Sequence, residues 1–469
     1  MKGFNFKLIL CTLLSIQNLF AQKVLGFQEY LTLVYKNHPL IKQADIYDLL
    51  GAQEVRLARG GFDPKFDFDM TQKVYSGKKY YDYLDFGLKI PTWYGADIKM
   101  GYENNSGVNQ NPADYTPKGG LMFAGLEVDL KGIVFDERRL AVRTAQNMQK
   151  LNKAERLKYV TKTVFSATKD YWEWFMAYTK YQMKLQNYEL ALQTYEAVVG
   201  KIVGGDMAKI DSVEAAVNLY EREIELKDSK NELKASSLNL SLNLWTETLQ
   251  PLELEEATQP EDLKEQPNLP DTTFQSLYDK MKMYQPEIQK LNLKILKLEL
   301  DKKLYSQLFL PQATAYGKYL NSPTTFDMSD VNTNYLSKNY KFGIHLIQPI
   351  FLRKDRAKLQ ASKLKIKQTT FEQIYTVQQY EVSLKQTLND IEAYNNIFKT
   401  QLKMYKAAEK LYEGEKAKFE AGEATLFYLN VRQTKMYESK IKTVSYYAKL
   451  QKAIAQLSYI CAELPQSTN

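Results

Sequence analysis

The chain has 469 residues, of which 44% are apolar and 25% charged, and this composition excludes a largely disordered protein. Its 63 basic residues outnumber its 55 acidic ones by eight. Basic and acidic residues are interleaved along the chain, which favours solvated helix faces over a nucleic-acid-binding patch. No run of 18 apolar residues occurs after the N-terminal segment. A membrane-embedded mature chain would therefore have to cross the bilayer with β-strands.

The N-terminus has the pattern of a secretory signal. Lys2 and Lys7 lie beside an apolar stretch, residues 8–20, which is followed by the small residue Ala21. We interpret residues 1–21 as a signal peptide that is cleaved after Ala21. The alternative is a membrane anchor, which requires ~20 apolar residues and is longer than this run. Cys461 is then the one cysteine of the mature chain, so an intramolecular disulfide is excluded.

Two long stretches lack both glycine and proline, residues 133–199 and 350–413. Apolar residues recur in them at helical spacing, which predicts continuous helices over 137–200 and 355–420. At ~1.5 Å per residue each helix would be on the order of 100 Å long. Typical globular helices are several times shorter.

The order of elements occurs twice. Each copy consists of a helix of about 35 residues, a strand, a returning strand, the long helix and a second helix. In the first copy the predicted helix, the two strands and the second helix are 27–60, 65–75, 120–130 and 207–247. In the second copy they are 274–307, 312–320, 340–350 and 424–462. Two pairs of motif residues, Pro39 with Pro286 and Pro64 with Pro311, match at an offset of 247 residues, and two more, Gly125 with Gly343 and Arg138 with Arg356, match at an offset of 218. We therefore predict a first repeat at 22–247, a proline-rich linker at 248–273 with a short strand at 252–254, and a second repeat at 274–469.

The strands alternate between apolar and charged residues. This pattern predicts that Phe66, Phe68, Leu126 and Val128 face lipid. The residues predicted to face a water-filled lumen are Asp67, Asp69, Glu127 and Asp129. A half-buried soluble sheet alternates in the same way, but the signal peptide and the absence of a helical span favour a membrane barrel. Four core strands are too few to enclose even a small lumen, which takes ~8. Several copies of the chain must then share one barrel.

Nothing in the sequence indicates catalysis. His38 and His345 lie far apart and lack the spacing of metal ligands. The glycine-containing stretch 200–205 lacks the spacing of a phosphate-binding loop. The aromatic stretch 171–175 indicates packing between long helices. The sequence therefore predicts a protein that is not an enzyme and that uses no metal, no cofactor and no nucleic acid.

Several motifs resemble the TolC-like outer-membrane efflux family, and they do so along the whole mature chain. They are residues 35–39 (YKNHP), 62–68 (FDPKFDF), 203–213 (VGGDMAKIDSV), 342–356 (FGIHLIQPIFLRKDR) and 419–429 (FEAGEATLFYL). The resemblance implies an α+β membrane protein, in which a homotrimer forms one twelve-stranded outer-membrane β-barrel continued by a long α-helical periplasmic barrel. It also implies a periplasmic adaptor and an inner-membrane pump or ABC exporter as partners.

One stretch departs from the family. Residues 76–118 offer two further strand-like segments, 82–90 and 94–104, that have no counterpart in the second half. We favour an extra hairpin outside the shared barrel. The alternative is a pair of additional barrel strands.

The far ends of the long helices carry the remaining candidate sites. The residues expected at adaptor-contacting tips are Gly204, Gly205, Asp206, Ala421, Gly422, Glu423 and Thr425. The resemblance implies a narrow aperture near these tips, and carboxylates there would favour cations. The aperture candidates are Glu409, Glu413, Glu415 and Glu420.

The functional hypothesis is an outer-membrane channel of a tripartite efflux pump or a type I secretion system, with a periplasmic helical extension. Cargo would pass through a gated trimeric tunnel. The alternative is a secreted structural coiled-coil protein with a small β-region.

Overall fold

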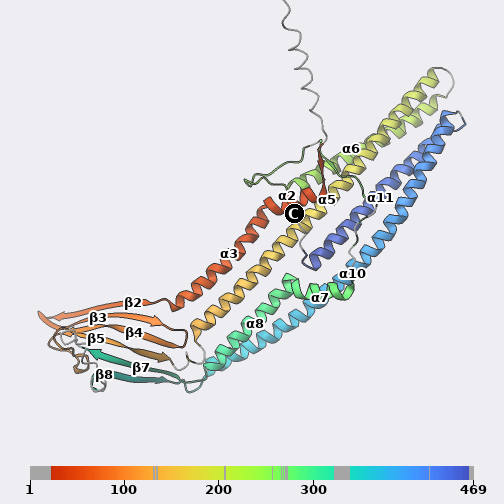
Figure 1. The fold of residues 1–469 in the computed structure, drawn as a ribbon. Helices are drawn as coiled ribbons and strands as arrows, with labels where there is room; N and C mark the ends of the chain where they lie inside the picture. The colour runs from red at the N-terminus through yellow and green to blue at the C-terminus, as the bar shows by residue number, and fades with distance from the viewer. Residues whose placement is uncertain are drawn as a thin grey trace, which may run out of the picture. The chain divides into compact units, whose positions relative to one another are not determined.

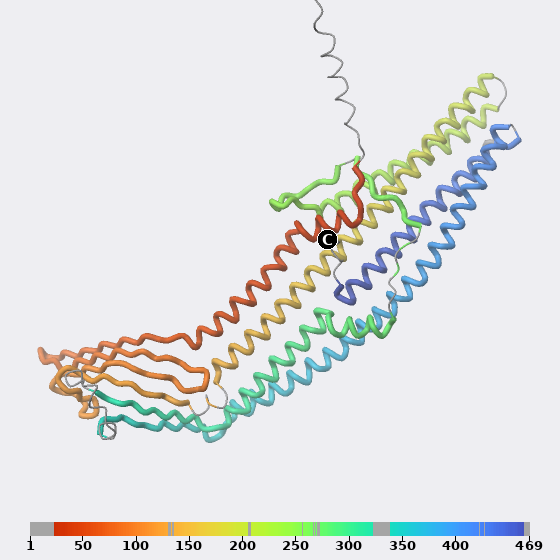
Figure 2. Tube along the Cα trace, in the orientation of Figure 1, coloured from red at the N-terminus to blue at the C-terminus, as the bar shows by residue number. Residues whose placement is uncertain are grey.

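The computed structural model describes residues 23–129, 133, 136–204, 208–255, 257–265, 267, 269, 273–321, 338–421 and 423–463. The predicted signal peptide lies outside these residues. The chain divides into two compact units. Figures 1 and 2 show the course of the backbone from the N-terminus to the C-terminus. The sheet unit comprises Ile46–Glu155 and Glu287–Thr376, and the helical unit comprises the rest. Each unit is described by itself.

The sheet unit is built on six strands in the order β2-β3-β4-β5-β7-β8, and every neighbouring pair is antiparallel. The strands are β2 (Lys65–Tyr75), β3 (Lys78–Pro91), β4 (Ala96–Ser106), β5 (Leu121–Asp129), β7 (Gln312–Asn321) and β8 (Tyr340–Ile347). Figure 1 shows them as one continuous layer. The four strands predicted from the two repeats all form.

The preferred interpretation of residues 76–118 is wrong. Strands β3 and β4 do not form a separate hairpin but lie between β2 and β5, paired on both sides. The pairing of β3 with β4 extends from Asp82–Ser106 to Pro91–Asp97. The physical reason is that both segments alternate like their neighbours, so they offer the same two faces and a full set of backbone hydrogen bonds.

Both long helices are confirmed. Helix α5 (Glu137–Val203) has 67 residues and α10 (Arg353–Glu420) has 68. The return helices also form, as α6 (Lys209–Ser241) and α11 (Leu426–Ile460). Among the described residues, no helix is both long and apolar enough to span a bilayer.

The two helices predicted over 27–60 and 274–307 are each broken in two. The first becomes α2 (Phe27–Asn37) and α3 (Pro39–Arg59), and the second becomes α7 (Phe274–Tyr284) and α8 (Pro286–Gln307). The break lies before a proline in both cases, because the proline ring disfavours helical backbone in the preceding residue. His38 and Gln285 accordingly have extended ψ angles of 129° and 117°.

The side chains at these breaks hold the ends of other helices in the helical unit. Asn37 donates a hydrogen bond to the Trp245 carbonyl oxygen (2.9 Å), just beyond α6. Gln285 donates to the Ile460 carbonyl oxygen (3.1 Å), at the end of α11. Burial lowers the pKa of His38, whose Nδ1 accepts a hydrogen bond from the Leu40 amide (3.1 Å) and caps α3.

The predicted strand at residues 252–254 is wrong, because the linker contributes its strand a few residues later. Strand β6 (Gln259–Pro260) pairs in parallel with β1 (Val24–Leu25). The Tyr171 hydroxyl donates to the Leu25 carbonyl oxygen (2.9 Å) and ties this pair to α5.

The core of the helical unit is an aromatic cluster. Tyr171 and Trp174 on α5 are 0% and 1% exposed. Phe398 on α10 is 0% exposed, and its ring lies 5.4 Å from that of Tyr447 on α11. Trp172 also contacts Tyr447, at 5.4 Å. The interpretation of residues 171–175 as packing residues is confirmed.

We expect Phe398→Ala to lower the free energy of unfolding by about 3–5 kcal/mol, because it leaves a cavity in this cluster. The matched control is Lys399→Ala, one position along the same helix and exposed. Guanidinium unfolding of the detergent-solubilised protein, followed by far-UV circular dichroism, compares the two. A similar loss in both variants would contradict the assignment of Phe398 to the core.

Candidate channel-lining face and helical-tip groove

The sheet has one polar face, and a row of lysines crosses it from edge to edge. Backbone pairing places directly opposed residues on the same face. One row of such partners runs through all six strands and consists of Lys65, Lys89, Lys99, Gly125, Lys318 and Lys341. A single register thus collects five ammonium groups from five strands.

Carboxylates lie on the same face as the lysines. Asp67 is two positions from Lys65 on β2, and Glu127 is two positions from Gly125 on β5. Asp69 is paired with Asp85, which is paired with Glu103. The four predicted lumen residues, Asp67, Asp69, Glu127 and Asp129, therefore share one face of the sheet.

The opposite face is apolar. The row beside the lysines consists of Phe66, Leu88, Met100, Ala124, Tyr319 and Tyr340. Phe68, Leu126 and Val128 lie on this face as well. Much of it is open to solvent in the single chain, with Phe66 62% and Phe342 64% exposed. So extended an apolar surface on a sheet indicates contact with lipid or another apolar partner.

Ion pairs connect the strands across the polar face. Lys89 bridges Asp97 (2.9 Å) and Glu127 (3.2 Å), and Lys99 also pairs with Glu127. Lys318 pairs with Glu103 (3.3 Å), and its Nζ lies 3.8 Å from the centre of the Phe123 ring. Six charged residues of this face are thus paired across strands, which limits the cost of holding them together.

Arg138 joins the sheet to the first turn of α5. Its guanidinium pairs with Asp97 on β4 (2.9 Å) and with Asp136 (2.6 Å). Asp136 is the N-cap of α5, because its Oδ1 accepts the Arg138 amide hydrogen (2.7 Å). Hydrogen bonding to Asp136 is the largest cause that raises the pKa of Arg138. The guanidinium also stacks 5.4 Å from the Phe62 ring centre.

Glycines let aromatic rings lie flat on the polar face. A side chain at Gly101 would meet the Phe123 ring at 2.7 Å and the backbone oxygen of Phe86 at 2.2 Å. A side chain at Gly343 would meet the Tyr316 ring at 2.4 Å. Strand glycines that allow such close approach are typical of curved sheets.

The predicted tip residues lie at the ends of the long helices where they are described. Gly204 follows α5 directly, and its amide donates to the Gly200 carbonyl oxygen (3.1 Å). Ala421 follows α10, and the Glu423 amide reaches back to the Lys418 carbonyl oxygen (2.8 Å) in the six-residue span of a Schellman cap. Thr425 is the N-cap of α11. Gly205, Asp206 and Gly422 lie outside the described residues.

The four aperture candidates lie along the last three turns of α10, in different surroundings. Glu409 accepts a hydrogen bond from the Tyr405 hydroxyl (2.6 Å), and burial together with this carboxylate raises the pKa of Tyr405. Glu415 is half-buried, 4.0 Å from Arg432 on α11. Glu413 and Glu420 are exposed. Among the described residues, no cluster of histidine, cysteine and carboxylate side chains suits a metal ion.

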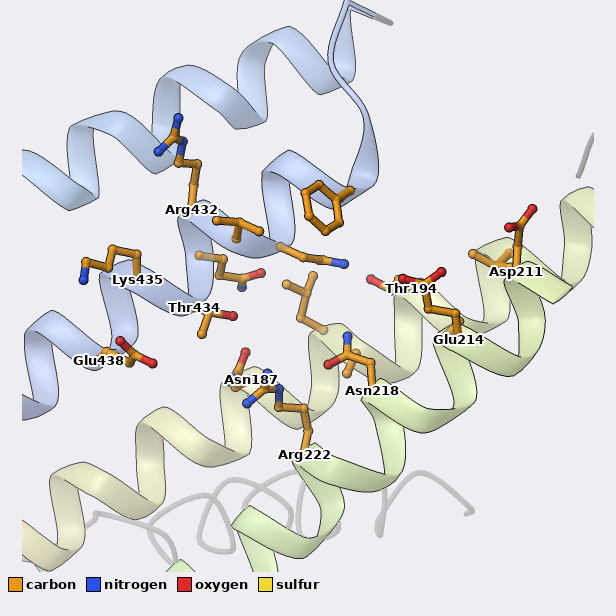
Figure 3. A pocket seen from close by; sticks show the side chains of 18 residues that line it. Asn187, Thr194, Asp211, Glu214, Asn218, Arg222, Arg432, Thr434, Lys435 and Glu438 are labelled. Carbon is orange, nitrogen blue, oxygen red and sulfur yellow. The ribbon is translucent and has the colours of Figure 1, made fainter.

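The helical unit contains a groove that was not predicted from the sequence. It has a volume of ≈ 700 Å³ and is lined by α5 from Asn187 to Val198, α6 from Asp211 to Arg222, and α11 from Phe427 to Glu438 (Figure 3). Its apolar lining residues are Leu190, Ala191, Val198, Ala215, Phe427 and Val431. The charged ones are Asp211, Glu214, Arg222, Arg432, Lys435 and Glu438. A signal was present in the sequence, since Val431 and Phe427 are apolar residues one helical turn apart.

A groove of this kind suits one class of ligand best. An apolar floor between helices with a charged rim is the surface into which an amphipathic helix packs.

No protein-family model and no curated protein matches the chain, but solved structures do. The Campylobacter jejuni CmeC outer membrane channel is 14% identical, with 94% of this chain and 86% of that chain covered and a TM-score of 0.62. The Neisseria gonorrhoeae MtrE outer membrane channel in its open state is 12% identical, with 95% and 93% covered and a TM-score of 0.64. The Vibrio cholerae outer membrane protein VceC is 12% identical, with 93% and 95% covered and a TM-score of 0.61.

The chain has the fold of the TolC-like outer-membrane efflux channels. The resemblance drawn from the sequence motifs is thereby confirmed at the level of the fold. The likeness extends through both units, since more than nine-tenths of the chain is covered in each comparison.

We expect Arg138→Met to lower the free energy of unfolding by about 2–3 kcal/mol, because it removes the shared partner of two nearly buried carboxylates. Lys89 remains beside Asp97 and limits the loss. The control is Arg143→Met, on an exposed position of the same helix. Thermal unfolding in detergent is the measurement, and equal stabilities of the two variants would contradict the role of Arg138.

Proposed function

We propose that the chain is an outer-membrane channel that conducts cargo out of the cell envelope without bond chemistry. The observation that carries this proposal is the two-faced sheet. An exposed apolar face opposite a charged face is the pattern of a wall between lipid and water. The structural neighbours include proteins described as outer membrane channels, and their likeness in fold supports the same role.

The working form is a homotrimer. The sheet is open, because the outer edges of β2 and β8 pair with no strand in the described part of the chain. Open edges inside a bilayer would leave backbone groups without hydrogen bonds, so the sheet must be completed by other copies. Closed cyclic symmetry is the rule for such assemblies.

The partners are a periplasmic adaptor and an inner-membrane pump or ABC exporter. The groove between α5, α6 and α11 fits a helical hairpin of an adaptor, with Phe427 and Val431 as apolar contacts. The tip residues Gly204, Gly205, Asp206, Ala421, Gly422, Glu423 and Thr425 would form the rim of this docking site. Glu409, Glu413, Glu415 and Glu420 would line the periplasmic aperture, where carboxylates favour cations.

Two adjacent residues of β3 test the membrane assignment. We expect Phe86→Arg to lower the stability of the membrane-inserted protein by about 2–4 kcal/mol if the residue lies near the bilayer midplane, because the substitution places a charge in lipid. Asp85→Arg, on the polar face one position away, should be tolerated. The measurement is the amount of each variant that fractionates with the outer membrane and requires detergent for extraction. Equal effects would mean that the faces are misassigned, and a chain soluble without detergent would favour the secreted coiled-coil protein.

Photocrosslinking tests the adaptor site. A photoreactive residue at Phe427 or Glu423 should capture a periplasmic adaptor in cells, because Phe427 lines the groove and Glu423 belongs to its proposed rim. The control is Val382, which is also exposed but lies outside the groove, on α10. Capture from Val382 alone, or of a cell-surface neighbour from Glu423, would contradict the assignment.

A further inference from the structure

The two strands inserted between β2 and β5 have the dimensions of membrane-crossing strands. Strand β3 has 14 residues and β4 has 11. A tilted strand crosses the hydrocarbon core with about 9–11 residues. Both inserted strands are therefore long enough to belong to the wall of a barrel.

Their side chains also continue the two faces of the sheet. Lys89 and Lys99 belong to the lysine row, and Leu88 and Met100 belong to the apolar row beside it. Glu127 on β5 receives ion pairs from both lysines, so the polar contacts of the neighbouring strand depend on the inserted pair. A hairpin outside the barrel wall would not need charged residues on one face and apolar residues on the other.

The open edges of the sheet are complementary in direction. Six strands that alternate in direction leave β2 and β8 antiparallel to each other. The β8 edge of one copy can thus pair with the β2 edge of the next as an ordinary antiparallel ladder. Insertion of two strands, an even number, preserves this match.

We propose that three copies close an eighteen-stranded barrel in place of the twelve-stranded barrel that the family resemblance implies. This inference rests on the proposed homotrimer. Because barrel diameter grows roughly linearly with strand number, the lumen would be about 1.5-fold wider than that of twelve strands. Barrels of 16–18 strands leave an aqueous channel. Such a lumen would admit hydrated solutes too large for a twelve-stranded one.

The first experiment establishes how many copies share the barrel. Cysteines are placed along β2, at Phe66, Phe68 or Met70, and along β8, at Phe342, Ile344 or Leu346, in a Cys461→Ala background. Oxidation in outer membranes should give a covalent ladder that ends at the trimer. The control pair, Ile98→Cys with Leu126→Cys, joins directly opposed residues within one copy and should leave monomers. A ladder that ends at the dimer would overturn the proposal, because two copies supply twelve strands.

The second experiment counts the strands. Electron cryomicroscopy of the unmodified protein in nanodiscs should show eighteen strands, and a variant that lacks residues 76–106 should show twelve. The deletion joins β2 to the loop before β5 at the same end of the sheet and keeps the strands antiparallel. If the variant does not assemble, the strand count of the unmodified protein still decides. A trimer with twelve barrel strands would overturn this inference but leave the channel function intact, whereas a protein that does not insert at all would overturn the channel function as well.

Discussion

The polar and apolar faces of the sheet depend on one constraint, the continuous antiparallel register from β2 to β8. Side chains alternate along a strand with a period of two, so a shift of one residue would exchange the faces of that strand. The register holds Lys65 and Lys341, at opposite edges, in the same row. Both faces exist because the six strands keep this register through the lysine row, with a shift only at Lys73–Val74 near the end of β2. The proposed wall between lipid and water follows from these two faces.

Ion pairs on the polar face connect strands that are held in this register. Lys89 and Glu127 belong to strands that are not neighbours, and Lys99 lies between them. Arg138 extends the same network to the start of α5. The long helix therefore begins at a defined position relative to β4, and its N-cap, Asp136, belongs to the same set of contacts.

Much of the fold could be predicted from the sequence, because its main signals are local. The absence of glycine and proline predicts α5 and α10, and the alternation of Asp67, Phe68 and Asp69 predicts which face each occupies. The breaks before Pro39 and Pro286 are equally local, since the effect of proline on its predecessor applies to any helix. Both breaks could therefore have been predicted from the two prolines alone.

Other features depend on contacts between distant segments. Strands β3 and β4 belong to the main sheet because β2 pairs with β3 and β5 pairs with β4. The alternation of side chains does not predict which strands pair. The bridge from Lys89 to Glu127 joins residues 38 apart, and no sequence motif marks it. The groove likewise requires α11 to pack beside α5 and α6. The central tip glycines, Gly205 and Gly422, lie outside the described residues, and their role at the tips stays a prediction.

The central claim is that the sheet separates lipid from water, and the accessibility of β4 tests it most directly. Single cysteines at positions 98, 99, 100, 102 and 103 are exposed, in intact outer membranes, to a water-soluble maleimide that does not enter lipid. The account predicts labelling at 99 and 103, on the polar face, and protection at 98, 100 and 102, on the apolar face. Equal labelling at all five positions would contradict it, because it would mean that water reaches both faces of the sheet.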